Sequence, residues 1–185
     1  DGLNIWVAEL EDDLKTIRKE TLHPCIHVSQ EWEEVWPRVN EGAFVIKHNG
    51  TYYLQYSASG TQWQTYAEGY YPSKYPMGPF TYAPNNPLLR KTEGLVTGPA
   101  HGSIVEGPDG NLWQFYTIVL SNPPGGRRIG MDRVVFDKKG NMKVNVTDSP
   151  QWAPSSKVGV DKGDSGSLPV TINKLNAMNA LSKYS

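Results

Sequence analysis

Short runs of alternating hydrophobic and polar residues cover most of the chain, and residues that favour turns separate these runs. Alternation with a period of two predicts strands that bury one face, and no stretch of about 12 residues or more carries a convincing helical stripe. The clearest run extends from Ala43 to Ser57, where Asn49 and Gly50 supply the positive-φ turn between two strands. The pattern therefore predicts an all-β protein.

The same arrangement returns later in the chain. A second hairpin is predicted from strands at Gly102–Glu106 and Leu112–Tyr116, and its turn glycine, Gly110, stands 60 positions after Gly50. A third and a fourth strand are expected after each hairpin. They are Tyr66–Tyr71 and Gly78–Tyr82 in the first unit, and Ile129–Phe136 and Asn141–Val144 in the second. Each unit is thus predicted to be a four-stranded antiparallel meander.

A repeat of four antiparallel strands is typical of the blades of a β-propeller. The segments Asn4–Leu10 and Leu14–Ile17 are expected to be the third and fourth strands of a preceding blade. Propellers close with about 4–8 blades, whereas the chain offers two complete blades and one half blade. Residues 1–146 are therefore predicted to be part of a propeller. The missing N-terminal blades are its expected structural partner. Residues 147–167, rich in Ser, Pro, Gly and Lys, are predicted to be a linker, and residues 168–185 a tail of unknown role.

Composition and charge narrow the function classes. The chain has 18 basic and 19 acidic residues and no basic stripe, so neither nucleic acid nor a membrane is an expected partner. The single cysteine, Cys25, excludes an internal disulfide and a cysteine-based zinc site. Ten tyrosines and six tryptophans against four phenylalanines fit carbohydrate handling, because flat rings with a polar edge suit sugar faces, although the same residues also stiffen β-sheets.

A motif around Glu41 carries the first candidate chemistry. The segment Glu41–Ser57 begins with Glu-Gly and ends with Gly-Thr-Tyr-Tyr-Leu-Gln-Tyr-Ser, and it resembles the general-acid segment of glycoside hydrolase family 43. The family's usual proline after Glu-Gly is Ala43 here, a departure that leaves the acid in place. Downstream, Gly78-Pro79-Phe80 resembles the turn that closes the blade in this family. The resemblance implies that Glu41 is the general acid and faces the central funnel.

His101 lies in a second element of the same resemblance. The segment Gly98–Ser103 is similar to the Gly-X-Gly-His-X-Ser element that opens the next blade, and His101 follows Glu41 by 60 positions. The resemblance implies that His101 helps to hold a structural calcium ion, largely through water. A lone histidine is also common as a hydrogen-bonded core residue, and imidazole is an unusual partner for a cation that prefers oxygen. Both alternatives stay open. The spacing of 60 positions puts His101 and Glu41 at the same point of successive blades, so both are expected to face the funnel.

A third element contains Arg127. The segment Gly125–Arg133 resembles the strand that brings an arginine to the active site of this family, and an ungapped alignment puts that arginine at Arg127. A guanidinium there is expected to donate paired hydrogen bonds to sugar hydroxyls or to hold a catalytic carboxylate ionised.

Together these elements imply a five-bladed propeller that hydrolyses arabinose- or xylose-type linkages with inversion, in plant-type or other pentose-containing glycans, from a secreted or periplasmic location. Inversion needs a second carboxylate about 6.5–9.5 Å from the acid, to activate water. The family takes this base from the first blade and a pKa-tuning aspartate from the second, and the sequence contains neither motif. The chain alone is therefore expected to be inactive.

A non-catalytic glycan-binding or structural propeller is the alternative hypothesis. It would use exposed aromatic rings to stack on sugars, with Trp32, Trp36 and Trp63 as candidates. For the hydrolase, Trp36 and Trp63 are the candidate substrate-binding residues. The same tryptophans would also serve as packing residues between blades, and the sequence leaves these roles open.

Overall fold

The computed structural model describes residues 2–120 and 126–149, so most of the predicted linker and the whole predicted tail lie outside the described residues. Within this part of the chain the prediction of an all-β protein is confirmed. No α-helix is present there, and the single helical segment is a short 3-10 turn, η1 (Lys19–Thr21). No helix of the described residues is long and apolar enough to cross a membrane. The strands are β1 (Asn4–Val7), β2 (His23–His27), β3 (Asn40–His48), β4 (Thr51–Ala58), β5 (Ala67–Ser73), β6 (Val96–Glu106), β7 (Leu112–Leu120), β8 (Arg127–Phe136) and β9 (Met142–Val144).

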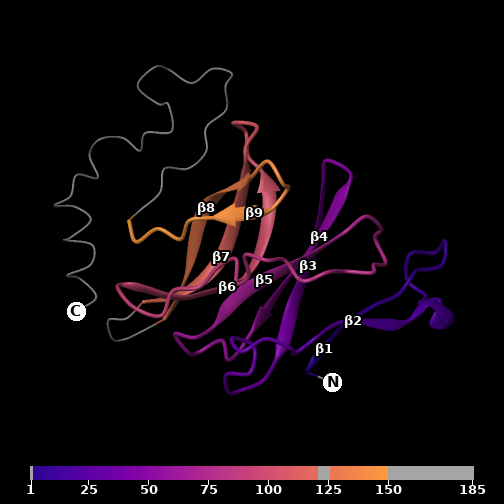
Figure 1. Ribbon diagram of the computed structural model, residues 1–185, viewed down its shortest axis with the longest axis horizontal. Coiled ribbons are helices and arrows are strands. Elements are labelled where there is room, and N and C mark those ends of the chain that lie inside the picture. Colours follow the sequence, from indigo (N-terminus) through magenta and orange to yellow (C-terminus); the bar gives the residue numbers. More distant parts are fainter. Residues whose placement is uncertain (1, 121–125, 150–185) are drawn as a thin grey trace.

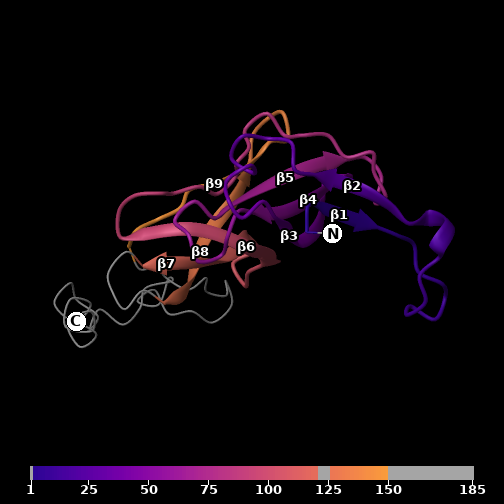
Figure 2. The ribbon, with the colours of Figure 1, turned by 90° about the horizontal axis from the view of Figure 1, so that it is seen from below.

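These strands form three antiparallel sheets that follow one another along the chain. Their strand orders are β1-β2, β3-β4-β5 and β6-β7-β8-β9, so within each sheet the strands pair in the order of the sequence. Figure 1 shows the second and third sheets side by side, and Figure 2 shows the three sheets in succession from the first to the third. Consecutive meanders of this kind fit the blades of a propeller.

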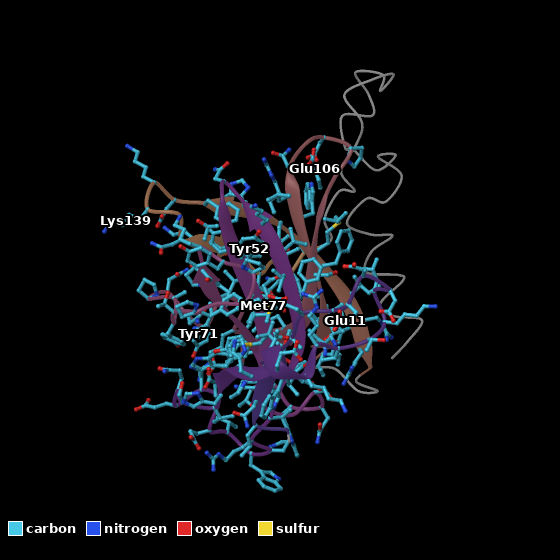
Figure 3. All side chains as sticks on the ribbon, turned by 90° about the vertical axis from the view of Figure 1, so that its right-hand side faces the viewer. Glu11, Tyr52, Tyr71, Met77, Glu106 and Lys139 are labelled. Carbon is cyan, nitrogen blue, oxygen red and sulfur yellow. The ribbon has the colours of Figure 1, made fainter. Side chains whose placement is uncertain are left out.

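Both predicted hairpins are confirmed. Asn49 and Gly50, between β3 and β4, have φ values of 46° and 74°, as a two-residue turn that follows the twist of the strands requires. The β6–β7 turn closes with a hydrogen bond from Gly110 N to Gly107 O of 2.9 Å. Tyr52 and Glu106, which lie next to these two turns, are both in the upper half of Figure 3. The start of β3, which carries Glu41, is at the opposite end of its strand.

The predicted fourth strand of the first unit, Gly78–Tyr82, is wrong. This segment has no strand assignment, and the sheet ends at β5. One backbone hydrogen bond, from Thr81 N to Pro72 O at 3.1 Å, ties it to that edge. Pro79 has no N–H group to donate, so a ladder along the segment would be interrupted.

The predicted pairing of the N-terminal segment is also wrong. β1 pairs with β2, in the register Asn4↔His27 and Val7↔His23, and only an isolated bridge joins Leu10 to Ile17. The Asp13 carboxylate accepts hydrogen bonds from the backbone N–H groups of Lys15 and Thr16, each 2.8 Å long. These bonds stabilise a tight turn, where a strand was expected, because aspartate readily bonds to backbone N–H groups close in sequence.

Two apolar clusters pack on opposite faces of the second sheet. One contains Tyr53 and Tyr70 together with residues of the third sheet, and the other contains Leu54 and Tyr56 together with residues of the first. Successive side chains of β4 point to opposite faces, so this strand contributes to both clusters. The sheets therefore pack face to face, which brings the start of β3 close to the middle of β6.

Candidate active site

Glu41 is the second residue of β3 and lies opposite Ser57 of β4. A register irregularity follows between Glu41 and Phe44, and Gly42 within it has φ of 64°. Such a bulge re-aims the side chains next to it. The Glu41 side chain stays 34% exposed, so its carboxyl group is open to solvent on one side and packed on the other.

The tyrosine hydroxyl of Tyr66 joins Glu41 to His101. It donates a hydrogen bond of 2.7 Å to Glu41 Oε1 and lies 3.1 Å from His101 Nδ1. The distance between His101 Nδ1 and Glu41 Oε1 is 3.8 Å. The three groups come from the start of β3, the β4–β5 loop and the middle of β6. The expectation that Glu41 and His101 face the same space is thus met by the geometry of the chain.

The Tyr66 phenol is held in its neutral, proton-donating form. Burial raises the pKa of Tyr66 far above its usual range, and the hydrogen bond to Glu41 and the charge of Glu41 raise it further. The positive charge of Arg127, the first residue of β8, acts in the opposite direction. Arg127 is exposed, and its charge acts on the Tyr66 phenol.

Gly42 leaves room for the imidazole of His101. A Cβ atom at this position would lie 3.1 Å from His101 Nδ1 and 3.2 Å from two ring carbons, which is tighter than ordinary contact. The positive φ of Gly42 is also unfavourable for any residue with a side chain. The Glu-Gly pair of the motif therefore has a physical role, because the glycine lets the acid and the histidine approach.

The two candidate tryptophans lie in loops near these groups. Trp63 is 50% exposed and precedes Tyr66 in one turn, closed by a hydrogen bond of 3.1 Å from Tyr66 N to Trp63 O. Trp36 is 80% exposed in the loop between β2 and β3. Its neighbour Pro37 and the ring of Trp63 both pack against Gly60, so the two loops lie side by side. Trp32, by contrast, is 7% exposed and donates a hydrogen bond to Tyr82, which removes it from the candidates for sugar stacking.

The described residues place no group of three or more His, Cys, Asp or Glu side chains together that is able to hold a metal ion. Calcium takes about 6–8 oxygen ligands, and the imidazole of His101 already lies against the Tyr66 hydroxyl. Contact of His101 with calcium stays a prediction.

Tyr66 was missed by the sequence analysis, which treated it as the first residue of a strand. It is 25 positions from Glu41 and 35 from His101, and no motif marks it. Its hydroxyl becomes part of the site because the β4–β5 loop folds over the start of β3 and the middle of β6.

Comparison with known proteins identifies the family. The family model of glycosyl hydrolases family 43 matches residues 2–142. The chain belongs to this family. A beta-D-galactofuranosidase of Aspergillus niger is 31% identical over 149 residues, which are 76% of this chain and 39% of that protein. A xylosidase/arabinosidase of Humicola insolens is 31% identical over 152 residues, which are 78% of this chain and 42% of that protein.

Solved structures of family 43 proteins share the fold of the chain. An endo-1,4-beta-xylanase from Bacteroides thetaiotaomicron matches with a TM-score of 0.72 and 33% identity, over 80% of this chain and 51% of that one. A thermostable family 43 glycoside hydrolase matches with a TM-score of 0.73 and 34% identity, over 83% and 51%. The three sheets thus fit part of a five-bladed β-propeller, as the sequence predicted. The chain spans about two fifths of the curated relatives and about half of these structures.

Proposed function

We propose that the protein containing this chain is a glycoside hydrolase in which Glu41 is the general acid. Family membership supports hydrolysis of a glycosidic bond. The observation that carries the role of Glu41 is its carboxyl group, partly open to solvent at the start of β3 and held by the Tyr66 hydroxyl at 2.7 Å. An acid must be fixed within hydrogen-bond reach of the leaving oxygen, and a neutral phenol that donates to one carboxyl oxygen leaves the other free for the substrate.

Arabinose- or xylose-containing glycans are the proposed substrates, with inversion at the anomeric carbon. The names of the Humicola and Bacteroides proteins support this class, whereas the Aspergillus protein is named for a galactofuranoside. In an inverting mechanism Glu41 protonates the leaving oxygen while a second carboxylate, about 6.5–9.5 Å away, activates water. We assign neither this base nor the pKa-tuning aspartate to a residue of the chain.

Three further residues are proposed to bind the substrate. Arg127 is an exposed cation whose charge acts on Tyr66, and it is able to donate paired hydrogen bonds to sugar hydroxyls. The exposed rings of Trp36 and Trp63 lie in adjacent loops, where they offer apolar faces to a sugar ring.

The test is Glu41→Gln in the complete protein, with kcat/KM measured for a natural oligosaccharide and for an aryl glycoside with an acidic leaving group. The substitution keeps the shape but removes the transferable proton, so the natural substrate should react about 10²–10⁴-fold more slowly. The aryl substrate needs little protonation and should lose much less. Equal losses on both substrates, or full activity with the oligosaccharide, would show that Glu41 is not the acid and would favour a binding role.

A further inference from the structure

A fully buried carboxylate lies directly behind His101. Glu68, on β5, is 0% exposed and accepts three hydrogen bonds from N–H groups of three other strands. Gly102 N of β6 donates to Oε2 at 2.7 Å, and the amides of Gln55 (β4) and Gln114 (β7) donate to Oε1 at 2.7 and 2.8 Å. A buried carboxylate is costly unless its oxygen atoms are paired, and here both are paired. Glu68 therefore joins the second sheet to the third at the strand that carries His101.

The backbone of β6 is unusual where Glu68 contacts it. The register between β6 and β7 shifts on both sides of Ala100, and His101 has φ of 54°. This left-handed conformation is unfavourable for a residue with a side chain, and it persists only where surrounding contacts hold it. Two consecutive N–H groups are held by the neighbouring sheet: His101 N donates to Ser57 Oγ at 2.8 Å, and Gly102 N donates to Glu68.

The side chains of Glu68 and Gln114 also pack closely against the backbone of Gly102. A Cβ atom at residue 102 would lie 2.0 Å from Gln114 Nε2 and 2.8 Å from Glu68 Oε2, so only glycine fits beneath the cluster. The carboxylate thus fixes both the hydrogen bond and the position of Gly102. A displacement of Gly102 would also move His101, the residue before it in β6.

We propose that Glu68 is a positioning residue, which holds the Gly102 N–H and thereby keeps His101 in the left-handed conformation that places its imidazole against Tyr66 and Glu41. Its link to catalysis rests on the proposed function of Glu41. The Glu68 oxygen atoms accept from Gly102, Gln55 and Gln114, and within the described part of the chain no hydrogen bond joins Glu68 to Glu41. It acts through the backbone of β6.

The side-chain oxygen of Gln55, next to Glu68, helps to design a test of this proposal. Among the described residues, Gln55 Oε1 is a buried side-chain oxygen with no hydrogen-bond partner. In Glu68→Gln the new carbonyl is able to accept from Gly102, while the new NH₂ group faces Gln55 and Gln114. Both amides then turn their oxygen atoms toward it, so Gln114 Nε2 donates to Gln55 Oε1 in place of the present 2.8 Å bond from Gln55 Nε2 to Gln114 Oε1. The Gln55 NH₂ group then takes the place of the oxygen that has no partner now, a cost to stability that leaves the acceptor for Gly102 unchanged. Glu68→Gln should therefore preserve the position of His101, whereas Glu68→Met, of similar shape but without an acceptor, should not.

The experiment compares these variants in the complete protein by the ¹³Cε1–¹H NMR signal of His101, assigned with His101→Gln, and by steady-state kinetics. Glu68→Met should shift the His101 signal and lower kcat about 10–100-fold with little change in KM, because a displacement of about 1 Å is enough for such a loss. Glu68→Gln should retain both the signal and kcat close to the wild-type values.

Glu33→Met is the matched control. Glu33 is also 0% exposed and accepts hydrogen bonds from Ser29 N, Gln30 N and the Tyr56 hydroxyl. Tyr56 follows Gln55 in β4 and points to the opposite face, so this variant removes an equally buried carboxylate away from β6. It should lose stability but keep the His101 signal of the wild type.

An unchanged His101 signal in Glu68→Met, or an equal change in Glu33→Met, would overturn the proposal. Equal losses in Glu68→Gln and Glu68→Met would also overturn it, since an acceptor for the Gly102 N–H group would then not be enough to hold His101. The NMR signal does not depend on hydrolysis. If Glu41 is not the acid, the two substrates of the Glu41→Gln test reveal it, while the His101 signal still decides the role of Glu68.

Discussion

Glu68 should make the stability of the protein depend on pH in an unexpected direction. Burial raises the pKa of Glu68 from 4.5 to about 8, although N–H donation from Gly102 and Gln114 lowers it. The folded protein therefore binds this proton more tightly than the unfolded chain does. The stability linked to Glu68 is complete below pH 4.5 and is lost as the pH rises through about 8.

The magnitude follows from the interval between the two pKa values. From 4.5 to about 8, at about 1.36 kcal/mol per pH unit, the loss amounts to roughly 5 kcal/mol. This is a large part of the roughly 5–15 kcal/mol that stabilises a typical domain. Glu68→Gln has no such titration, so its stability relative to the wild type should increase by a few kcal/mol as the pH rises through about 8.

Urea unfolding of both proteins in the complete form, from about pH 5 to about pH 9, measures this difference. Other titrating groups are common to the two proteins, so their contributions cancel when the two free energies of unfolding are subtracted. Parallel curves over this range would refute the assignment. A wild type that gains stability over Glu68→Gln as the pH rises would mean that the N–H donors outweigh the cost of burial.

Two substitutions at the site complete the predictions. Tyr66→Phe removes the hydroxyl that donates a hydrogen bond to Glu41, and this bond is worth about 1 kcal/mol at this partly exposed site. The value of kcat/KM for the natural oligosaccharide should therefore fall about 5- to 10-fold. Unchanged kinetics would contradict the role of Tyr66. Gly42→Ala should lower the stability of the protein by about 1 kcal/mol, because residue 42 has φ of 64°, and it should also lower activity by displacing His101. Gly50→Ala is the control, because residue 50 has φ of 74° but open space around it. It should show the same loss of stability in thermal unfolding, with normal activity.

Local patterns determined the class of the fold and most of its strands. The β3–β4 hairpin was predictable because alternating residues and Asn49-Gly50 act within a few positions of one another. The same kind of pattern failed at Gly78–Tyr82, where apolar and polar residues alternate but Pro79 removes a donor and the sheet ends at β5. It also missed β2, whose pairing with β1 spans about 20 residues and a local turn at Asp13. Whether a segment forms a strand thus depends on residues close in sequence, whereas the strand with which it pairs does not.

Glu41 and His101 were found in the sequence because each lies in a short motif, and the spacing of 60 residues predicted that they belong to successive blades. The sequence did not reveal Tyr66 or Glu68. Neither carries a motif, and their partners lie between 13 and 46 positions away, on strands of the second and third sheets. The left-handed backbone of His101 is likewise invisible in a one-dimensional pattern, because contacts from Ser57 and Glu68 stabilise it. The sequence by itself determined which residue types and strands are present, since these follow from interactions over a few positions. Only the packing of one sheet on the next decided which buried polar groups meet, because hydrogen-bond partners must be found wherever burial has removed water.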